Sequence, residues 1–326
     1  MEQRKEITMS RLQRFLVVSL IAVFVATLAP AALAESYKFG ASKPGGSWYP
    51  IGTVLQRLAD KNYGDKVTVE IGGGTGNLLN VMSGKLSFGL ASATSIQEAL
   101  KGAKMFKGKV AQAKKVRVAA VLYPNYLFWL VWAKSDVTSY QQLKGKKVNV
   151  MPKRFSFQAL NQQMLGALGI EYKDFSKVNY LGFNDAVAQM KDNHIDAYLG
   201  PGEENYAPIV QLATHAPIRI LSFSKEDVAK MKAANPGVVP FTLDKTNYKQ
   251  KNDVNTVQTF LLIITNEDVP AERVYKLTKT IYDNLGDFAG AVKAFERVKV
   301  ANATGDMGAP RHAGMDQYLK EKGLLK

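Results

Sequence analysis

Cysteine is absent from this chain of 326 residues, and histidine occurs only three times, as His194, His215 and His312. Without cysteine there can be no disulfide, no thiolate-bound zinc or iron–sulfur cluster and no thiol nucleophile. The three histidines lie far apart in the sequence, which argues against a histidine-rich metal site. We therefore expect no metal and no cofactor. Long apolar runs are also missing, apart from one near the N-terminus.

Acidic residues are scarce relative to basic ones: 43 Lys and Arg stand against 28 Asp and Glu, for a formal net charge of +15. Hydrophobic residues make up 46% and charged residues 22%, which is the composition of a globular protein. The stretch 101–117 is strongly basic, but Phe106 is the only aromatic residue within it, unlike a nucleic-acid-binding patch with interleaved aromatics. We expect a solvated surface that attracts anions weakly, and no nucleic-acid partner.

The N-terminus has the three parts of a secretory signal. A leader with four cations precedes the apolar run Phe15–Ala29, and Ala32-Leu33-Ala34 then forms a small-x-small cleavage pattern. A membrane anchor is the alternative, but the run is short against the ~20 residues that cross a bilayer. We expect residues 1–34 to be a signal peptide cleaved after Ala34, and the product to be periplasmic.

Strand and helix patterns alternate through the rest of the chain, which predicts parallel sheets covered by helices. A helix is expected near Ile51–Leu58, another begins at Leu78, and a third follows Asp268 as its cap. Further helices are expected at 157–168 and 186–193. Strands are expected at 37–40, 67–71, 87–91, 116–122, 127–133, 147–151, 195–199, 218–223 and 260–264.

A glycine-rich turn at 72–77 follows one predicted strand and precedes a helix. It is not a dinucleotide fingerprint, because Leu79 stands where the last glycine would be, and no Gly-Lys-Ser/Thr follows as in a P-loop. Free N–H groups at the start of a helix bind anions, and this turn also holds the polar residues Thr75 and Asn77. The turn is therefore a candidate anion site. A tight turn that simply needs glycine is the alternative.

The loop 45–50 has the same position between a strand and a helix, with Trp48 and Tyr49 at the helix mouth. Aromatic side chains there can wall a pocket, although core packing is the alternative. Two such loops would lie together at the carboxyl edge of one sheet, where open α/β sheets bind ligands. This coincidence favours a binding site.

Catalytic patterns are weak. No Gly-x-Ser-x-Gly elbow is present, and His194 lies in a predicted helix-to-strand turn, which favours a surface role. Glu203 and Glu204 could be a general base or a cation site, but a solvated loop is the better interpretation. An exported hydrolase or transferase would need a nucleophile–base pair that the sequence does not offer. We expect the protein not to be an enzyme.

Several segments, in this order and spacing, resemble the TAXI type of TRAP transporter solute-binding proteins. They are 45–52, 74–78, 83–89, 143–148, 196–198 and 269–279. The resemblance implies an α/β, two-lobed periplasmic binding protein of type II, with the ligand cleft between the lobes. Lobe 1 is expected at 35–125 plus 266–326 and lobe 2 at 126–265, with the hinge near 123–128 and 266.

The same resemblance implies a monomeric receptor that closes around a small solute and delivers it to a TRAP membrane permease. The solute would be a carboxylate such as a dicarboxylate or an acidic amino acid. A periplasmic sensor that presents a solute to a membrane receptor kinase is the alternative. The family's cleft-lining positions correspond here to Ser47, Trp48, Tyr49, Thr75, Asn77 and Ser92.

Three departures from the family pattern leave the solute open. Where the family has a small-residue loop, this chain has 151–157, in which Arg154, Phe155 and Ser156 are candidate ligand contacts. Arg154 could grip a carboxylate with two hydrogen bonds or face solvent. Gly200 begins a stretch that ends in Glu203 and Glu204, which could recognise an amino group or lie at the rim. Gly-Ser or Gly-Gly is more usual where Thr75-Gly76 stands.

Overall fold

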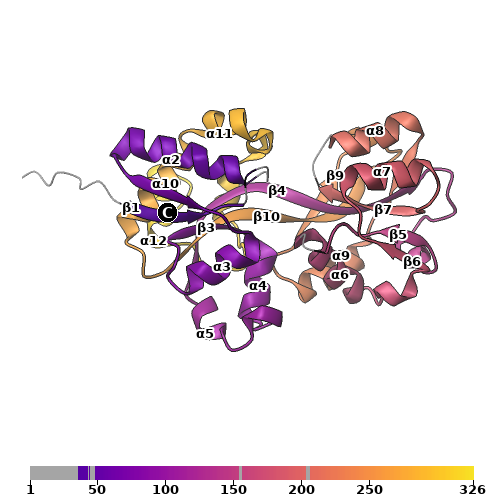
Figure 1. Cartoon of the computed structure of the whole chain (residues 1–326), viewed down its shortest axis with the longest axis horizontal. Coiled ribbons are helices and arrows are strands. Elements are labelled where there is room, and N and C mark those ends of the chain that lie inside the picture. Colours follow the sequence, from indigo (N-terminus) through magenta and orange to yellow (C-terminus); the bar gives the residue numbers. More distant parts are fainter. Residues whose placement is uncertain (1–35, 43, 45–47, 154–155, 203–205) are drawn as a thin grey trace, which may run out of the picture.

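The computed structural model describes residues 36–42, 44, 48–153, 156–202 and 206–326. Two lobes of helices and strands lie side by side, and the long strands β4 and β10 run from one to the other (Figure 1). The strands are β1 (Ser36–Gly40), β2 (Lys66–Glu70), β3 (Phe88–Ser92), β4 (Val116–Trp132), β5 (Lys147–Asn149), β6 (Lys177–Asn179), β7 (Ala197–Gly202), β8 (Ile218–Ile220), β9 (Val239–Leu243) and β10 (Val254–Asn266).

Helices cover both faces of the sheet in each lobe (Figure 1). In lobe 1, α2 and α11 lie on one side and α3, α4 and α5 on the other; in lobe 2, α7 and α8 lie opposite α6 and α9. The helices are α2 (Tyr49–Tyr63), α3 (Gly74–Met82), α4 (Ala93–Leu100), α5 (Val110–Ala113), α6 (Ser156–Ala167), α7 (Phe183–Lys191), α8 (Ala207–His215), α9 (Lys225–Ala234), α10 (Ala271–Tyr282), α11 (Leu285–Ala291) and α12 (Ala313–Glu321). Short 3-10 turns are η1 (Lys104–Phe106), η2 (Tyr140–Leu143), η3 (Tyr172–Asp174), η4 (Asn247–Lys249), η5 (Lys293–Arg297) and η6 (Val300–Thr304).

The strands of the described chain form one sheet in the order β2-β1-β3-β10-β4-β7-β5-β6, with β8 on β4 and β9 on β10. The pairs β1–β2, β1–β3, β5–β6 and β5–β7 are parallel. Strand β10 is antiparallel to β3, β4 and β9, and β4 is antiparallel to β7 and β8. The expected purely parallel arrangement is therefore wrong, because the two long strands pass through the sheet in opposite directions.

The two strands expected at 116–122 and 127–133 are one continuous strand, β4. Pro124 lies between the two expected segments, and it pairs with Phe260 within the ladder, close to a register shift between Phe260 and Leu262. A proline is tolerated beside such an irregularity because its missing N–H is not needed there. The continuous strand β4 is therefore part of the sheet in both lobes.

Two helix starts also differ from expectation. Helix α3 begins at Gly74 rather than Leu78, so Thr75 and Asn77 belong to its first turn and not to a loop. Pro270, not Asp268, is the N-cap of α10. The inner stripe of α10 is as expected, since Val274 and Ile281 are fully buried.

Hydrophobic packing separates the lobes. One buried cluster fills lobe 1 around β1, β3, α2 and α10, and includes Phe260–Ile264 of β10. Lobe 2 has a cluster on each face of its sheet, because alternate residues of β4 point to opposite faces: Trp129 packs on one side and Phe128 on the other. Residues 260–264 thus pack with lobe 1, a few residues earlier than the expected crossing at Asn266.

His312 gives the fold a dependence on pH. It caps α12 by accepting a hydrogen bond from the Gly314 N–H at Nδ1, 3.2 Å away, and burial lowers the pKa of its side chain below the usual value. Because the unfolded chain binds a proton here more readily, stability should fall as the pH drops below about 6.5.

We expect wild-type protein to lose stability between pH 7 and pH 5, and His312→Asn, which keeps a capping acceptor, to lose less of it over that window. Urea unfolding at the two pH values measures the difference. Equal pH dependence in both proteins would contradict this assignment.

Among the described residues, no helix combines the length and the apolar character needed to cross a membrane.

Candidate functional site

The carboxyl ends of the parallel strands in the two lobes point toward each other. Strand β3 runs antiparallel to β10, and its last residue, Ser92, pairs with Leu261 near the middle of β10. Strand β7 runs antiparallel to β4, and its last residue, Gly202, pairs with Tyr126 near the middle of β4. Loops that leave both sets of strands therefore converge beside the centre of the long strands.

Asn77 ties the lobe 1 side of this region together. The residue is 1% exposed, and its side-chain Nδ2 donates hydrogen bonds to the carbonyl oxygens of Gly40, Ala41 and Leu90, at 3.0, 3.0 and 2.9 Å. The amide thus joins α3 to the end of β1 and to the middle of β3. An ideal Cβ on Gly40 would stand 2.6 Å from Asn77 Oδ1, so this glycine makes room for the amide.

This placement differs from the expectation that the Asn77 side chain meets the solute. Its amide N–H groups are already directed at protein carbonyls, because the helix begins four residues earlier than the sequence suggested and turns the side chain into the core. In this structure the side chain of Asn77 holds the elements around it together.

Trp48 and the start of α3 lie together, as the convergence of the two loops predicts. Trp48 is the partly buried N-cap residue of α2, and an ideal Cβ on Gly74 would be 3.4 Å from its indole ring. Tyr49 opens α2 and Thr75 lies in the first turn of α3, both partly exposed. Their predicted role as ligand contacts stays a prediction.

Ser92 lies in a cluster of hydroxyl groups. Its Oγ accepts a hydrogen bond from Thr94 N at 3.3 Å, capping α4, and lies 2.7 Å from Thr94 Oγ1 and 3.3 Å from Thr259 Oγ1. Thr259 belongs to β10, so the cluster borders the long strand. Sequence reasoning did not find Thr259, since nothing local marks it.

A seam joins the lobes on the α4 side. Asn235, fully buried after α9, donates from Nδ2 to the carbonyl oxygen of Thr94 at 3.3 Å and to Gln163 Oε1 at 3.0 Å. Lys101 Nζ donates to the Ala234 carbonyl oxygen. A Cβ on Gly237 would lie 2.7 Å from the Ala93 backbone, so the seam requires glycine there. The only sequence signal was the turn-like Asn-Pro-Gly at 235–237.

In lobe 2, Gly200 lies within β7, directly opposite Phe128 of β4. Met151 lies two residues after the end of β5 and is buried. Its φ of 69° is an unusual conformation for a residue that is not glycine. Ser156 begins α6. The predicted contacts Ser47, Arg154 and Phe155 lie outside the described residues, as do Glu203 and Glu204.

Arg297, which no sequence pattern marked, lies over the middle of β4. Its guanidinium carbon is 5.9 Å from the ring centre of Tyr123 and 5.7 Å from that of Tyr126. Tyr126 stacks in turn on Phe241 of β9, with centroids 4.2 Å apart and planes 2° from parallel. Arg297 Nη1 is buried, and it has no hydrogen-bond partner in the described part of the chain.

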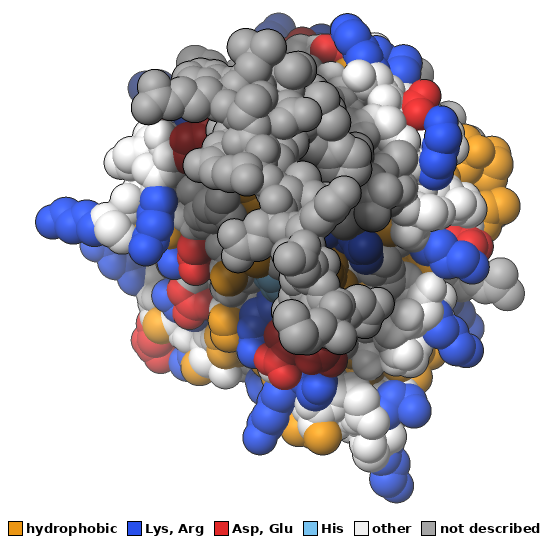
Figure 2. Space-filling view, turned by 90° about the vertical axis from the view of Figure 1, so that its left-hand side faces the viewer, with side chains coloured by type: hydrophobic (Ala, Val, Ile, Leu, Met, Phe, Trp, Pro, Cys, Tyr) orange, Lys and Arg blue, Asp and Glu red, His pale blue; other side chains and the backbone are white. Residues whose placement is uncertain are grey.

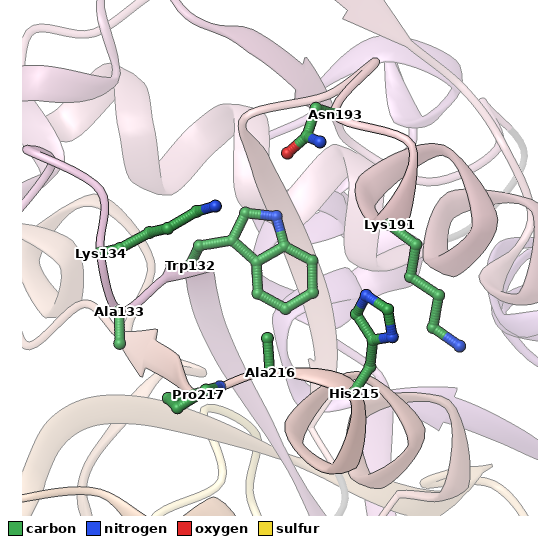
Figure 3. A pocket seen from close by; sticks show the side chains of 8 residues that line it. All are labelled: Trp132, Ala133, Lys134, Lys191, Asn193, His215, Ala216 and Pro217. Atoms are coloured by element: carbon green, nitrogen blue, oxygen red, sulfur yellow. The ribbon is translucent and has the colours of Figure 1, made fainter.

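A separate cavity of about 260 Å³ opens at the outer end of lobe 2 (Figure 3). The Trp132 indole forms its floor, donating its N–H to the Met190 carbonyl oxygen at 3.2 Å, and His215 lies with its ring centre 5.9 Å away. The lining residues are Trp132, Ala133, Lys134, Lys191, Asn193, His215, Ala216 and Pro217. None of the predicted ligand contacts that the structure describes lines this cavity.

Part of the basic stretch 101–117 is paired with acidic side chains and part is exposed. Lys115 and Arg117 pair with Glu267, while Lys107 and Lys109 are exposed. On the face in Figure 2, Lys and Arg side chains are spread around the rim with acidic groups between them. Among the described residues there is no group of three or more His, Asp or Glu side chains that could hold a metal ion.

The sequence profile of the NMT1-like family matches residues 39–323. Among solved structures, a TctC solute-binding protein from Polaromonas is 13% identical, with 90% of this chain and 98% of that chain covered and a TM-score of 0.56. The periplasmic sulfonate-binding protein SsuA of a putative ABC transporter from Methylobacillus flagellatus is 13% identical, with 89% and 96% covered and a TM-score of 0.50.

A protein from Xanthomonas citri bound to ATP is 10% identical, with 89% of this chain and 96% of that chain covered and a TM-score of 0.51. At these identities the likeness establishes the fold alone. The predicted fold class is confirmed: the chain has the α/β, two-lobed fold of type II periplasmic binding proteins.

Proposed function

Because this chain belongs to the NMT1-like family and has a periplasmic binding fold, we propose that it is the extracytoplasmic solute receptor of a TRAP-type transporter of the TAXI kind. It binds a small carboxylate between its lobes and delivers it to the membrane permease. It acts in the periplasm as a monomer and catalyses no reaction.

The observation that carries this proposal is the convergence of strand ends beside β4 and β10. Ser92 and Gly202 end strands of opposite lobes, and both pair with residues near the middle of the long strands. A solute held there would contact both lobes at once, and its binding would favour the arrangement in which the lobes are close. We place the lobes at 35–125 plus 266–326 and at 126–265, and residues 260–264 at the end of the second segment pack with lobe 1.

The carboxylate assignment is supported by charge and by helix geometry. Helices α3 and α4 begin beside the converging strand ends, and helix N-termini favour negative groups. The formal net charge of +15 adds a weak general attraction for anions.

Thermal unfolding of residues 35–326 against a panel of small acids and amino acids tests the function. A ligand at 100 times its Kd stabilises the folded state by about 2.7 kcal/mol, which is a visible shift. We expect a shift with a dicarboxylate or an acidic amino acid, and none with sodium chloride at equal ionic strength. If the melting temperature rises only with neutral solutes, the protein is a receptor for another class of solute and the assignment of a carboxylate ligand is wrong.

A further inference from the structure

We propose that Arg297 is the anion-binding residue of this receptor and holds the carboxylate of the solute against the middle of β4. The inference rests on the proposed function, since it names the group that recognises the solute. It assigns this role to a residue of the C-terminal part of lobe 1, outside every segment in which the sequence suggested ligand contacts.

The first reason is an unused donor. Arg297 is partly buried, and its Nη1 atom is shielded from solvent and has no hydrogen-bond partner among the described residues. Buried polar groups without a partner are rare and costly, and a charged group costs more than a neutral one. The other such atom is the Tyr198 hydroxyl, whose pKa burial raises, so it stays neutral. A negatively charged ligand would complete the surroundings of Arg297.

The second reason is how the guanidinium is held. It lies over the rings of Tyr123 and Tyr126, so aromatic contact holds it in place while Nη1 has no partner among the described residues. Phe241 supports Tyr126 from lobe 2, and Phe295 packs edge-on against Tyr123 at 5.6 Å from lobe 1. A stacked, preorganised fork suits the two oxygens of a carboxylate.

The third reason is position. Tyr126 pairs with Gly202, the end of β7, and with Gln258 of β10. Tyr123 packs in the lobe 1 cluster and Tyr126 in a lobe 2 cluster. Arg297 therefore spans the boundary between the lobes at the place where the lobe 2 strand ends. An anion bound there would contact Arg297 of lobe 1 and lie beside the end of β7 in lobe 2.

The test uses succinate and L-glutamate as probes, with uncharged succinamide beside them, in calorimetric titrations of three variants. Arg297→Gln removes the charge and the fork, and Arg297→Lys keeps the charge without the fork. Lys299→Gln makes the same change of net charge at an exposed side chain two residues away. The melting temperature of each unliganded protein shows that it is folded.

We expect Arg297→Gln to weaken binding of the carboxylate probe about 10- to 100-fold, the span of a charged hydrogen bond. Arg297→Lys should lie between that variant and wild type, and Lys299→Gln should change affinity less than about twofold. Equal affinity of Arg297→Gln and wild type would overturn the proposal. Wild-type binding of succinamide but not of either acid would also overturn it, while leaving a solute receptor in place.

Discussion

Replacing Asn77 with aspartate is expected to destabilise the fold by about 3 kcal/mol or more at pH 7. The side chain keeps its shape but loses the amide donor that now serves the carbonyl oxygens of Gly40, Ala41 and Leu90. A buried carboxylate would face three oxygens with no donor between them. The loss should appear in urea unfolding as a lower midpoint with an unchanged slope.

The pH dependence of the destabilisation caused by Asn77→Asp is a second check. Burial among carbonyls would raise the folded-state pKa of the new carboxyl above the unfolded value of about 3.9, so the destabilisation grows as the pH rises above that value. The gap between variant and wild type should therefore narrow from pH 7 to pH 4. A gap that stays constant, or a loss below about 1 kcal/mol, would contradict the role of Asn77 as the tie between β1, β3 and α3.

Replacing Gly200 with valine is expected to cost about 3 kcal/mol, although valine favours strands. An ideal Cβ at this position would lie under 3.0 Å from three carbons of the Phe128 ring, which is fully buried on the neighbouring strand. The ring must move, and the core of lobe 2 around it must open. A melting curve of the unliganded variant measures the effect.

Gly76→Ala is the matched control. Gly76 lies in helix α3 with nothing within 4 Å of its ideal Cβ, so alanine should stabilise by about 0.5–1 kcal/mol. Opposite signs at the two glycines are the expected pattern. An unchanged melting temperature of Gly200→Val would contradict the close packing of β7 against the Phe128 ring.

The parts of the fold that the sequence predicted correctly are those with a local signal. The stripe of Ile51, Leu55 and Leu58 identified α2, and the β-branched run before Gly72 identified β2. Such patterns depend on residues within one or two helical turns or along one strand. The resemblance to a family of binding proteins supplied the two-lobed architecture, which no local pattern contains.

The misplaced features depend on distant partners. Pro124 stays in a strand because β10, more than 100 residues later, pairs with it beside an irregularity. Asn77 points inward because the end of β1 and the middle of β3 present carbonyl oxygens to it. Neither the strand position of Pro124 nor the direction of the Asn77 side chain can be predicted from the residues next to them in the sequence.

Arg297 shows the same limit within the candidate site. It ends a short 3-10 turn without periodic neighbours, and its aromatic partners Tyr123 and Tyr126 belong to β4. A buried guanidinium without a partner can be recognised only once the side chains around it are placed. Arg154 became a candidate only because it lies where the family has a small-residue loop, and a side chain that faces solvent was the open alternative.

The place of β10 in the sheet sets the order in which the chain can fold. It lies between β3 and β4, and Ser92 pairs with Leu261. The edges of β3 and β4 that pair with β10 thus stay exposed until β10 is available. Bringing together strands so far apart in the sequence is slow. During synthesis the N-terminal part of the chain must remain without its central strand. An incomplete sheet of this kind leaves time for chaperones or a translocation machinery to engage the chain before it becomes compact.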